Sequence, residues 1–303
     1  MPAEPGYIRL YHKGVLESIA SELEEIYHCC RLCPHNCRVD RTNGEKGICA
    51  TGAEPVVASF GPHFGEEPPL TGFRGSGTVF FSGCSLKCIY CQNYDISQFR
   101  HGSAVTSERL ADIMLSLQAQ GCHNINFVTP THVIPSVLRA LLIAVEGGLS
   151  VPLVYNSSGY DSMEILRLLD GIFDIYMPDF KYAEGKTGIE LSGITQYPEV
   201  AKDAIKEMYR QVGDLVVDKH GIAVKGLIVR HLILPGHTDE SKRIIDFIKS
   251  LSSGIYLNLM DQYHPEYKVF DIPDMNRRIT KAEYAEVVSY AVGKGMTKGL
   301  SDE

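Results

Sequence analysis

Seven of the nine cysteines in this chain fall into two tight groups. The first group consists of Cys30, Cys33, Cys37 and Cys49, and the second consists of Cys84, Cys88 and Cys91. An odd number of cysteines does not suit a framework of disulfides, whereas clustered thiols at short spacings are typical of metal ligands. The sequence therefore predicts two metal sites, and the fold has to be built around both of them.

The composition is that of an ordinary globular protein, with 44% hydrophobic and 22% charged residues in 303 positions. The 29 Lys and Arg residues against 37 Asp and Glu residues give a net charge of −8. This charge disfavours sequence-independent binding to nucleic acids, because such binding needs Lys and Arg to neutralise phosphates. No apolar stretch approaches the ~20 residues of a membrane span, and the first residues lack a signal-peptide pattern. We therefore expect a cytoplasmic protein with neither a nucleic-acid nor a membrane partner.

Residues 1–72 contain the first cysteine group, many glycines and prolines, and one expected helix around residues 15–27. The apolar content of this segment is thin for a core of its own. We therefore expect that a bound metal, or docking on the rest of the chain, keeps it folded. The sequence divides into this cysteine-rich metal-binding segment, 1–72, and a larger unit, 73–303.

From about residue 76 onward, short apolar runs of strand length alternate with amphipathic stretches. The six runs span residues 78–82, 125–128, 151–155, 172–177, 227–234 and 255–260. Pro135 suits the first turn of a helix. Capping-box spacing occurs at two further helix starts, Asp161 with Glu164 and Thr280 with Glu283. Six strand–helix units predict an α/β fold with a mostly parallel sheet, arranged as a partial TIM-like (βα)6 barrel that is open at one side.

The second cysteine group has the spacing C-x3-C-x2-C, with Tyr90 directly before the third cysteine, and it follows the first expected strand. Three thiolates so close together can hold three irons of a [4Fe–4S] cluster and leave the fourth iron open. An open iron can chelate S-adenosylmethionine (SAM), and reductive cleavage of SAM releases a 5′-deoxyadenosyl radical. A zinc knuckle completed by a nearby histidine is the alternative.

The motif Cys84, Cys88, Cys91 resembles that of the radical SAM superfamily. Residues 75–84 and the segment from Cys91 to Asn93 are similar to the branch named after the pyruvate formate-lyase activating enzyme, whose members also carry a C-x2-C-P-x2-C segment like the one that starts at Cys30. The resemblance implies a [4Fe–4S] cluster, SAM as cofactor, a flavodoxin- or ferredoxin-like electron donor, and hydrogen abstraction from a protein or peptide substrate.

Every expected strand ends in polar residues, and in barrels of this kind the chemistry lies at the C-terminal ends of the strands. One shared pocket explains this better than six unrelated polar ends. The candidate cofactor-binding residues, two of them in the cysteine loop, are Tyr90, Asn93, Thr129, Thr131, His132, Asn156, Ser157, Ser158, Asp179, Lys181, Arg230, His231, Tyr263 and His264.

Activating enzymes have a Gly-Gly-Glu-type segment after the second strand, which binds the SAM amino group. This chain has Thr-Pro-Thr-His there, so Thr129 and Thr131 are the candidates for that role. For His132, a contact with the ligand and a hydrogen bond within the loop are both open. Residues 156–158 resemble the family's Asp-Thr-Asn segment, which implies contacts to the SAM ribose and to a monovalent cation.

The segment Met-Pro-Asp-Phe-Lys resembles the family's Met-Leu-Asp-Leu-Lys. It implies that Lys181 pairs with the SAM carboxylate and that Asp179 helps to hold the cation; a solvated ion pair is the alternative. Arg230 or His231 is implied to face the ribose or methionyl part, although His231 also suits a core histidine. The Tyr263–His264 pair is implied to lie near the adenine.

The N-terminal cysteines, with four thiolates and a C-x2-C start, suit a closed tetrahedral site. Zinc and an auxiliary iron–sulfur cluster both accept such ligands, and zinc is favoured because the ferredoxin spacing is absent. Cys29 is an alternative ligand to Cys30.

Three functions are compatible with these patterns. The leading one is a radical SAM enzyme of the glycyl radical activase type. The second is radical modification of a small molecule or a peptide side chain, and the third is a non-catalytic iron–sulfur protein for electron transfer or redox sensing.

Overall fold

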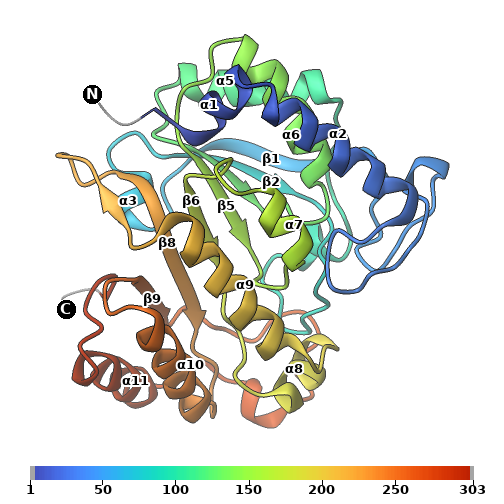
Figure 1. The fold of residues 1–303 in the computed structure, drawn as a ribbon. Coiled ribbons are helices and arrows are strands. Elements are labelled where there is room, and N and C mark those ends of the chain that lie inside the picture. The colour runs from blue at the N-terminus through green and yellow to red at the C-terminus, as the bar shows by residue number, and fades with distance from the viewer. Residues whose placement is uncertain (1–3, 301–303) are drawn as a thin grey trace.

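The computed structural model describes residues 4–300, which form a nine-stranded sheet with helices around it (Figure 1). Six strands pair in parallel, each with the next along the chain. They are β2 (Ser76–Phe81), β4 (Ile125–Val128), β5 (Leu153–Ser157), β6 (Ile175–Pro178), β8 (Ala223–Leu232) and β9 (Tyr256–Met260). All six lie where the sequence predicted strands, which confirms the α/β fold with a partial, mostly parallel barrel.

The central strands are apolar because both of their faces are covered. Every residue of β5 and β6 is buried, as expected for parallel strands between a barrel interior and a layer of helices. Both strands begin two or three residues later than the apolar runs that predicted them. The difference at β6 has a local cause, since Asp174 caps two N–H groups from elsewhere, those of Gly6 (2.9 Å) and Leu153 (3.2 Å).

Three antiparallel strands extend the sheet beyond the predicted barrel. β1 (Val56–His63) pairs with β2, β3 (Ser103–Ala104) pairs with β1, and β7 (Val216–Val217) pairs with β8. The sequence did not predict β1, because Gly61 and Pro62 interrupt its pattern and seven of its eight residues are only partly buried or exposed. Its pairing brings the end of the N-terminal segment into the same sheet as the barrel.

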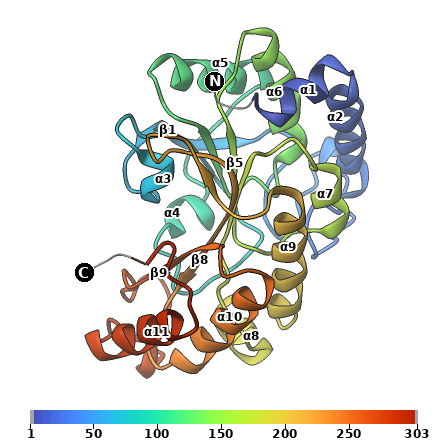
Figure 2. The same ribbon diagram turned by 60° about the vertical axis from the view of Figure 1, so that its left-hand side comes forward.

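The helices form an arc around the outside of the sheet, from α5 through α7 and α9 to α11 (Figure 2). The larger ones are α2 (Val15–Glu25), α5 (Ser107–Ala119), α6 (Ile134–Glu146), α9 (Tyr197–Val212), α10 (Thr238–Leu251) and α11 (Lys281–Gly293). The shorter ones are α1 (Gly6–His12), α3 (Pro68–Thr71), α4 (Tyr94–Ser97), α7 (Met163–Leu168) and α8 (Gly185–Ser192). Among the described residues, no helix is long and apolar enough to cross a membrane.

The helix-start predictions have different outcomes. Pro135 lies in the first turn of α6, as predicted. Thr280 and Glu283 form a reciprocal capping box at the start of α11, also as predicted. The capping box at Asp161 is wrong: α7 begins after Ser162, which makes no side-chain cap, and the Asp161 carboxylate accepts hydrogen bonds from side chains at the strand ends instead.

The N-terminal helices share the core of the barrel. Tyr7, Leu16 and Leu23 are fully buried and belong to the same hydrophobic cluster as the barrel helices. Tyr7 also donates a hydrogen bond to the carbonyl of Val151 (3.0 Å), and α2 packs along α6. Docking on the rest of the chain therefore supplies the core that residues 1–72 lack by themselves.

This shared core gives the first prediction. Leu23→Ala should lower the free energy of unfolding by about 2–5 kcal/mol, because it opens a cavity between α2 and the barrel. Chemical denaturation should show one transition at lower denaturant, whereas Glu22→Ala, at the exposed neighbouring position, should leave the midpoint unchanged. A separate early transition with the main one unmoved would instead establish 1–72 as an independently folding unit.

Candidate functional site

The loop after β2 carries the three spaced cysteines, and each thiol has a different partner. The Cys88 Sγ accepts a hydrogen bond from the Ser192 hydroxyl (2.9 Å) at the end of α8. The Cys91 Sγ lies 3.2 Å from the Ser97 Oγ, and the Cys84 Sγ accepts the N–H of Leu86, two residues further along (3.4 Å). Hydrogen bonds of this kind stabilise thiolates that bind metal.

A chain of hydroxyl groups continues from Cys88 into the protein. The Tyr182 Oη lies 2.6 Å from the Ser192 Oγ and 2.7 Å from the Tyr90 Oη, and 4.0 Å from the Cys88 Sγ. Tyr90, Tyr182 and Ser192 are all buried. Sequence analysis identified Tyr90 but missed Tyr182 and Ser192, because nothing in a helix-end serine or a lone tyrosine signals contact with a loop about a hundred residues away.

Two adjoining cavities, of about 160 and 220 Å³, lie against this loop. Residues that line both of them are Cys88, Cys91, Asn93, Asp179, Lys181 and Arg230. The first cavity extends to the ends of β4 and β5, at Thr129 and residues 156–158, and also contacts Cys84. The second extends to the ends of β8 and β9 and includes Tyr90, Met260 and Gln262. A larger hollow of about 520 Å³ lies elsewhere, beside α2 and the start of α5, and contains none of these residues.

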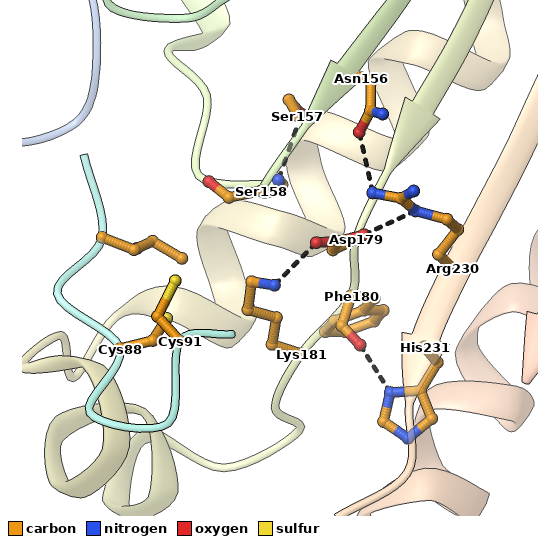
Figure 3. A network of polar contacts seen from close by, with 12 residues as sticks. Cys88, Cys91, Asn156, Ser157, Ser158, Asp179, Phe180, Lys181, Arg230 and His231 are labelled. Carbon is orange, nitrogen blue, oxygen red and sulfur yellow. Dashed lines mark hydrogen bonds and ion pairs between the residues drawn. The ribbon is translucent and has the colours of Figure 1, made fainter. Parts of the chain in front are cut away.

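A half-buried network of charged side chains lines both cavities, and Figure 3 shows its contacts. Asp179, just after β6, accepts from the Arg230 Nε (2.9 Å) through one oxygen and from the Lys181 Nζ (2.7 Å) through the other. Arg230, on β8, also donates to the Asn156 Oδ1 (2.8 Å) at the end of β5. Three neighbouring strands are thus connected by side chains that point into the barrel.

The charges of this network are mutually stabilised. Burial alone would raise the pKa of Asp179, but Arg230 and Lys181 hold it below its usual value. Burial acts in the opposite direction on Lys181, and Asp179 overcomes it and raises the pKa of that ammonium group. All three groups are therefore charged near neutral pH, and Asp179 and Lys181 form a half-buried pair with 17% and 19% of their side chains exposed.

Two carboxylates that the sequence analysis missed complete the network. Glu66 and Glu67 precede α3, and their oxygens lie 3.5 Å from the Arg230 Nη1 and 4.0 Å from the Arg230 Nε, respectively. Glu67 also accepts from the Asn258 Nδ2 (2.9 Å) on β9. Burial raises the pKa of Glu66 in spite of Arg230. Two acidic residues in a turn before a Pro-Pro pair carry no sequence signal for a place inside a barrel.

The polar residues after β4 and β5 divide into two sets. Thr131 and Ser157 donate to the buried Asp161 carboxylate, at 2.7 and 2.6 Å. Burial raises the pKa of Asp161, and these hydroxyl donors act against the rise. Ser158 lines the cavity with a buried hydroxyl that has no hydrogen bond among the described residues. Thr129 lines it too, with a left-handed backbone (φ 59°).

Two candidate histidines point away from the cavities. The His231 ring bonds to the Phe180 carbonyl (2.7 Å) and the Ser241 hydroxyl (2.8 Å), so both of its nitrogens have protein partners (Figure 3). The His132 Nε2 lies 2.9 Å from the Ser82 carbonyl. Burial lowers the pKa of each histidine to about 4. Both are neutral residues that hold backbone carbonyls, which agrees with the structural alternative for each.

Tyr263 and His264 lie behind the second cavity and do not line it. Tyr263 is fully buried, donates to the Met275 carbonyl (2.7 Å) and packs 5.9 Å from the Tyr90 ring. The His264 Nδ1 lies 3.1 Å from the Gln92 Nε2. The structure therefore gathers most of the candidates around the cavities, but Thr131, His132, His231, Tyr263 and His264 lie outside the lining.

The N-terminal cysteines lie beside the same loop. Cys33 is close to Cys30, Cys37 and Cys49, and burial, reinforced by these neighbours, raises its pKa to about 12. Cys29 is exposed, whereas Cys30 is buried. Within residues 4–300, no three Cys, His, Asp or Glu side chains converge closely enough to hold one metal ion.

A mostly parallel barrel with a three-cysteine loop over a cavity of half-buried charges is typical of barrel enzymes, whose sites lie at the C-terminal ends of the strands. Residues 78–248 match the family model described as Radical SAM superfamily, and the chain belongs to this superfamily. It is 33% identical, over 278 residues, to the uncharacterized protein MJ0674 of Methanocaldococcus jannaschii, with 88% of this chain and 75% of that protein covered. A second protein of that organism, uncharacterized protein MJ0808, is 23% identical over 80% of this chain and 73% of its own length.

Membership implies a [4Fe–4S] cluster, SAM and enzymatic radical chemistry. The described residues fit these groups. A cubane cluster gives each cysteine its own iron, so the three thiols need not meet at one point. Cys84, Cys88 and Cys91 all line the first cavity, and their sulfurs already have hydrogen-bond donors or hydroxyl groups beside them.

Proposed function

We propose that Cys84, Cys88 and Cys91 hold the cluster, that SAM occupies the two adjoining cavities, and that the enzyme abstracts hydrogen from a protein or peptide substrate, as a glycyl radical activase does. Reduction of the cluster with SAM bound supplies the 5′-deoxyadenosyl radical for this step. The observation that supports the proposal best is the half-buried Asp179–Lys181–Arg230 network, which borders both cavities together with Cys88 and Cys91.

The network suits the zwitterionic end of SAM. Lys181 suits the SAM carboxylate because its ammonium group has three N–H donors, one of which Asp179 accepts. Arg230 already donates to Asp179 and Asn156 and lies beside Glu66, so it holds this part of the network in place. The unpaired hydroxyl of Ser158 and the strained Thr129 suit the amino or ribose groups in the first cavity. The second cavity, with Tyr90 and Met260, suits the adenine. Both oxygens of Asp179 are occupied, so we do not place the predicted monovalent cation there.

One observation favours the second function, modification of a small molecule or a peptide side chain. The loops after β2 and β9 contact each other. Gln92 donates to the Gln262 carbonyl (3.1 Å) and contacts His264, and the rings of Tyr94 and Tyr267 stack with centroids 5.0 Å apart. These contacting loops lie beside the second cavity, which Gln92 and Gln262 line, and such an arrangement suits a small substrate or a slender peptide loop. A non-catalytic electron carrier would not need the SAM-sized cavities.

The experiment that tests the proposed function is anaerobic incubation with SAM and a chemical reductant. Formation of 5′-deoxyadenosine, measured by chromatography, is expected. The reaction should accelerate with the macromolecular fraction of a cell extract if the substrate is a protein or peptide, and with the low-molecular-mass fraction if it is small. Loss of SAM cleavage under all conditions would contradict both enzymatic proposals.

The cysteine assignment gives the second prediction. Cys88→Ala should abolish the iron–sulfur absorbance at the catalytic site and all 5′-deoxyadenosine formation, because the cluster loses an iron ligand. Cys122→Ala, which removes a buried cysteine outside both groups, should retain both. Wild-type cleavage in Cys88→Ala would show that the cluster lies elsewhere.

The third prediction concerns SAM affinity. Lys181→Ala should weaken SAM binding about ten- to a hundredfold, because a charged hydrogen bond contributes roughly 1.5–3 kcal/mol. Calorimetry on the reconstituted protein measures this change, and the cluster spectrum should be preserved. Lys186→Ala, an exposed lysine on α8, is the matched control. Equal affinity in both variants would remove Lys181 from the SAM site.

The fourth prediction follows from the hydrogen bond to Cys88. Ser192→Ala removes a donor to the sulfur, which makes added negative charge less favourable, so the midpoint potential of the cluster should become more negative. Spectroscopic redox titration measures the shift. Ser85→Ala lies in the same loop and removes a buried hydroxyl without a hydrogen bond among the described residues, so it should have little effect. An unchanged midpoint potential in Ser192→Ala would show that this hydrogen bond does not influence the reduction of the cluster.

A further inference from the structure

The backbone around the N-terminal cysteines is folded into a closed loop. The Arg38 N–H donates to the Cys30 carbonyl (2.9 Å), and the Cys30 N–H donates to the Val39 carbonyl (3.0 Å). Within this loop, the Asn36 N–H donates to the Cys33 carbonyl (3.0 Å) and forms a tight turn. The pairing brings Cys37 back toward Cys30, although neither segment belongs to a helix or a strand.

Backbone strain is concentrated at these cysteines. Among the described residues, six other than glycine have a positive φ, and three of the six adjoin this group. Asn36 (φ 47°) and Arg38 (φ 58°) flank Cys37, and Ala50 (φ 58°) follows Cys49. Such conformations cost about 1–3 kcal/mol each, and they persist where surrounding structure fixes them, frequently at functional sites. No other short segment of the described chain has this density of strain.

The backbone is crowded around these cysteines. Cys33 lies in the loop between Cys30 and Cys37 that the Arg38–Cys30 and Asn36–Cys33 backbone hydrogen bonds close. The chain also passes so close to Cys37 that a Cβ at Gly47 would lie 2.7 Å from its Sγ, which leaves room only for glycine. Tight turns and close backbone approach are what four cysteines need to share one ion, because each must present its sulfur to a common centre.

This segment contacts both neighbours of Cys84. The His35 Nε2 donates to the Ser85 carbonyl (2.7 Å). On the other side, a Cβ at Gly83 would lie 2.6 Å from the Thr51 Oγ1 and 3.0 Å from the Cys49 carbonyl. Cys84 is therefore held between His35 on one side and Cys49 and Thr51 on the other.

We propose that Cys30, Cys33, Cys37 and Cys49 hold a tetrahedral zinc ion, and that this zinc site fixes the loop that carries Cys84. Four thiolates saturate zinc and leave no open position, so the site is structural. The four cysteine side chains do not converge on one point among the described residues. The proposal therefore requires that metal binding draws the thiols together. The zinc site is independent of the proposed substrate, whereas its effect on the loop rests on the proposed role of Cys84.

Metal analysis tests the site itself. A variant with Cys84, Cys88 and Cys91 all changed to Ala should retain about one equivalent of zinc per chain. Adding Cys37→Ser should remove this zinc, whereas adding Cys29→Ser, at the exposed neighbouring thiol, should retain it. Iron with sulfide in place of zinc would overturn the zinc assignment, and the absence of any bound metal would overturn the site.

Hydrogen exchange tests the effect on the loop, independently of activity. In the full-length protein, Cys37→Ser should increase amide exchange over residues 82–91, and Cys29→Ser should not. Because Cys37→Ser can disturb folding, His35→Ala is the second variant. It should keep its zinc, yet exchange faster over 82–91 than His28→Ala, whose exposed ring contacts Thr42 and Asp40.

The two halves of the proposal fail in different ways. If zinc is present but exchange over 82–91 is unchanged in both Cys37→Ser and His35→Ala, the proposed effect on the Cys84 loop is wrong, and the zinc site itself is retained. Normal zinc and exchange effects without any SAM cleavage would count against the proposed function alone. His35→Gln, which keeps a donor near the Ser85 carbonyl, should restore slow exchange if the hydrogen bond is responsible.

Discussion

The pairing of Asp179 with both Lys181 and Arg230 is the interaction on which the rest of the site depends. Charges inside a barrel are tolerated only when each is paired, and removing one partner of such a pair costs about 3–5 kcal/mol because the other charge stays buried. Here one carboxylate fixes cations from two strands, and Arg230 extends the network to Asn156 and to Glu66. The inner surface of the barrel is therefore organised electrostatically before any cofactor arrives.

The sequence predicts those parts of the fold and the site that depend on patterns within a short stretch of chain, such as hydrophobic periodicity and cysteine spacing. Apolar runs located all six parallel strands, and the short cysteine motif located the loop after β2. Polar strand ends located Asp179, Lys181 and Arg230, because the C-terminal ends of parallel strands must meet at one face. Asp179 and Lys181 line a cavity together with Cys88 and Cys91, as the polar strand ends led us to expect.

The remainder could not be predicted because it depends on which side a residue faces, or on contacts between distant segments. His231 follows Arg230 directly, and strand alternation sends the two side chains to opposite faces. Asp161 has capping-box spacing, yet three hydroxyl groups at the strand ends bind its carboxylate. Glu67 reaches the site from a turn, and Ser192 reaches it from the end of a helix. At such positions no periodic pattern in the sequence indicates a functional residue.

The cysteine loop has no regular secondary structure of its own, and its backbone is held by segments far apart in the chain. The Ile89 N–H donates to the Leu191 carbonyl (2.9 Å), and the Ile89 carbonyl accepts from the Lys268 N–H (2.8 Å). Contacts with such large sequence separation form late. The loop therefore acquires its backbone supports only when residues as far along the chain as Lys268 have been synthesised and folded. A chain that ended before Leu191 would carry all three cysteines of the proposed cluster site but neither of these backbone supports.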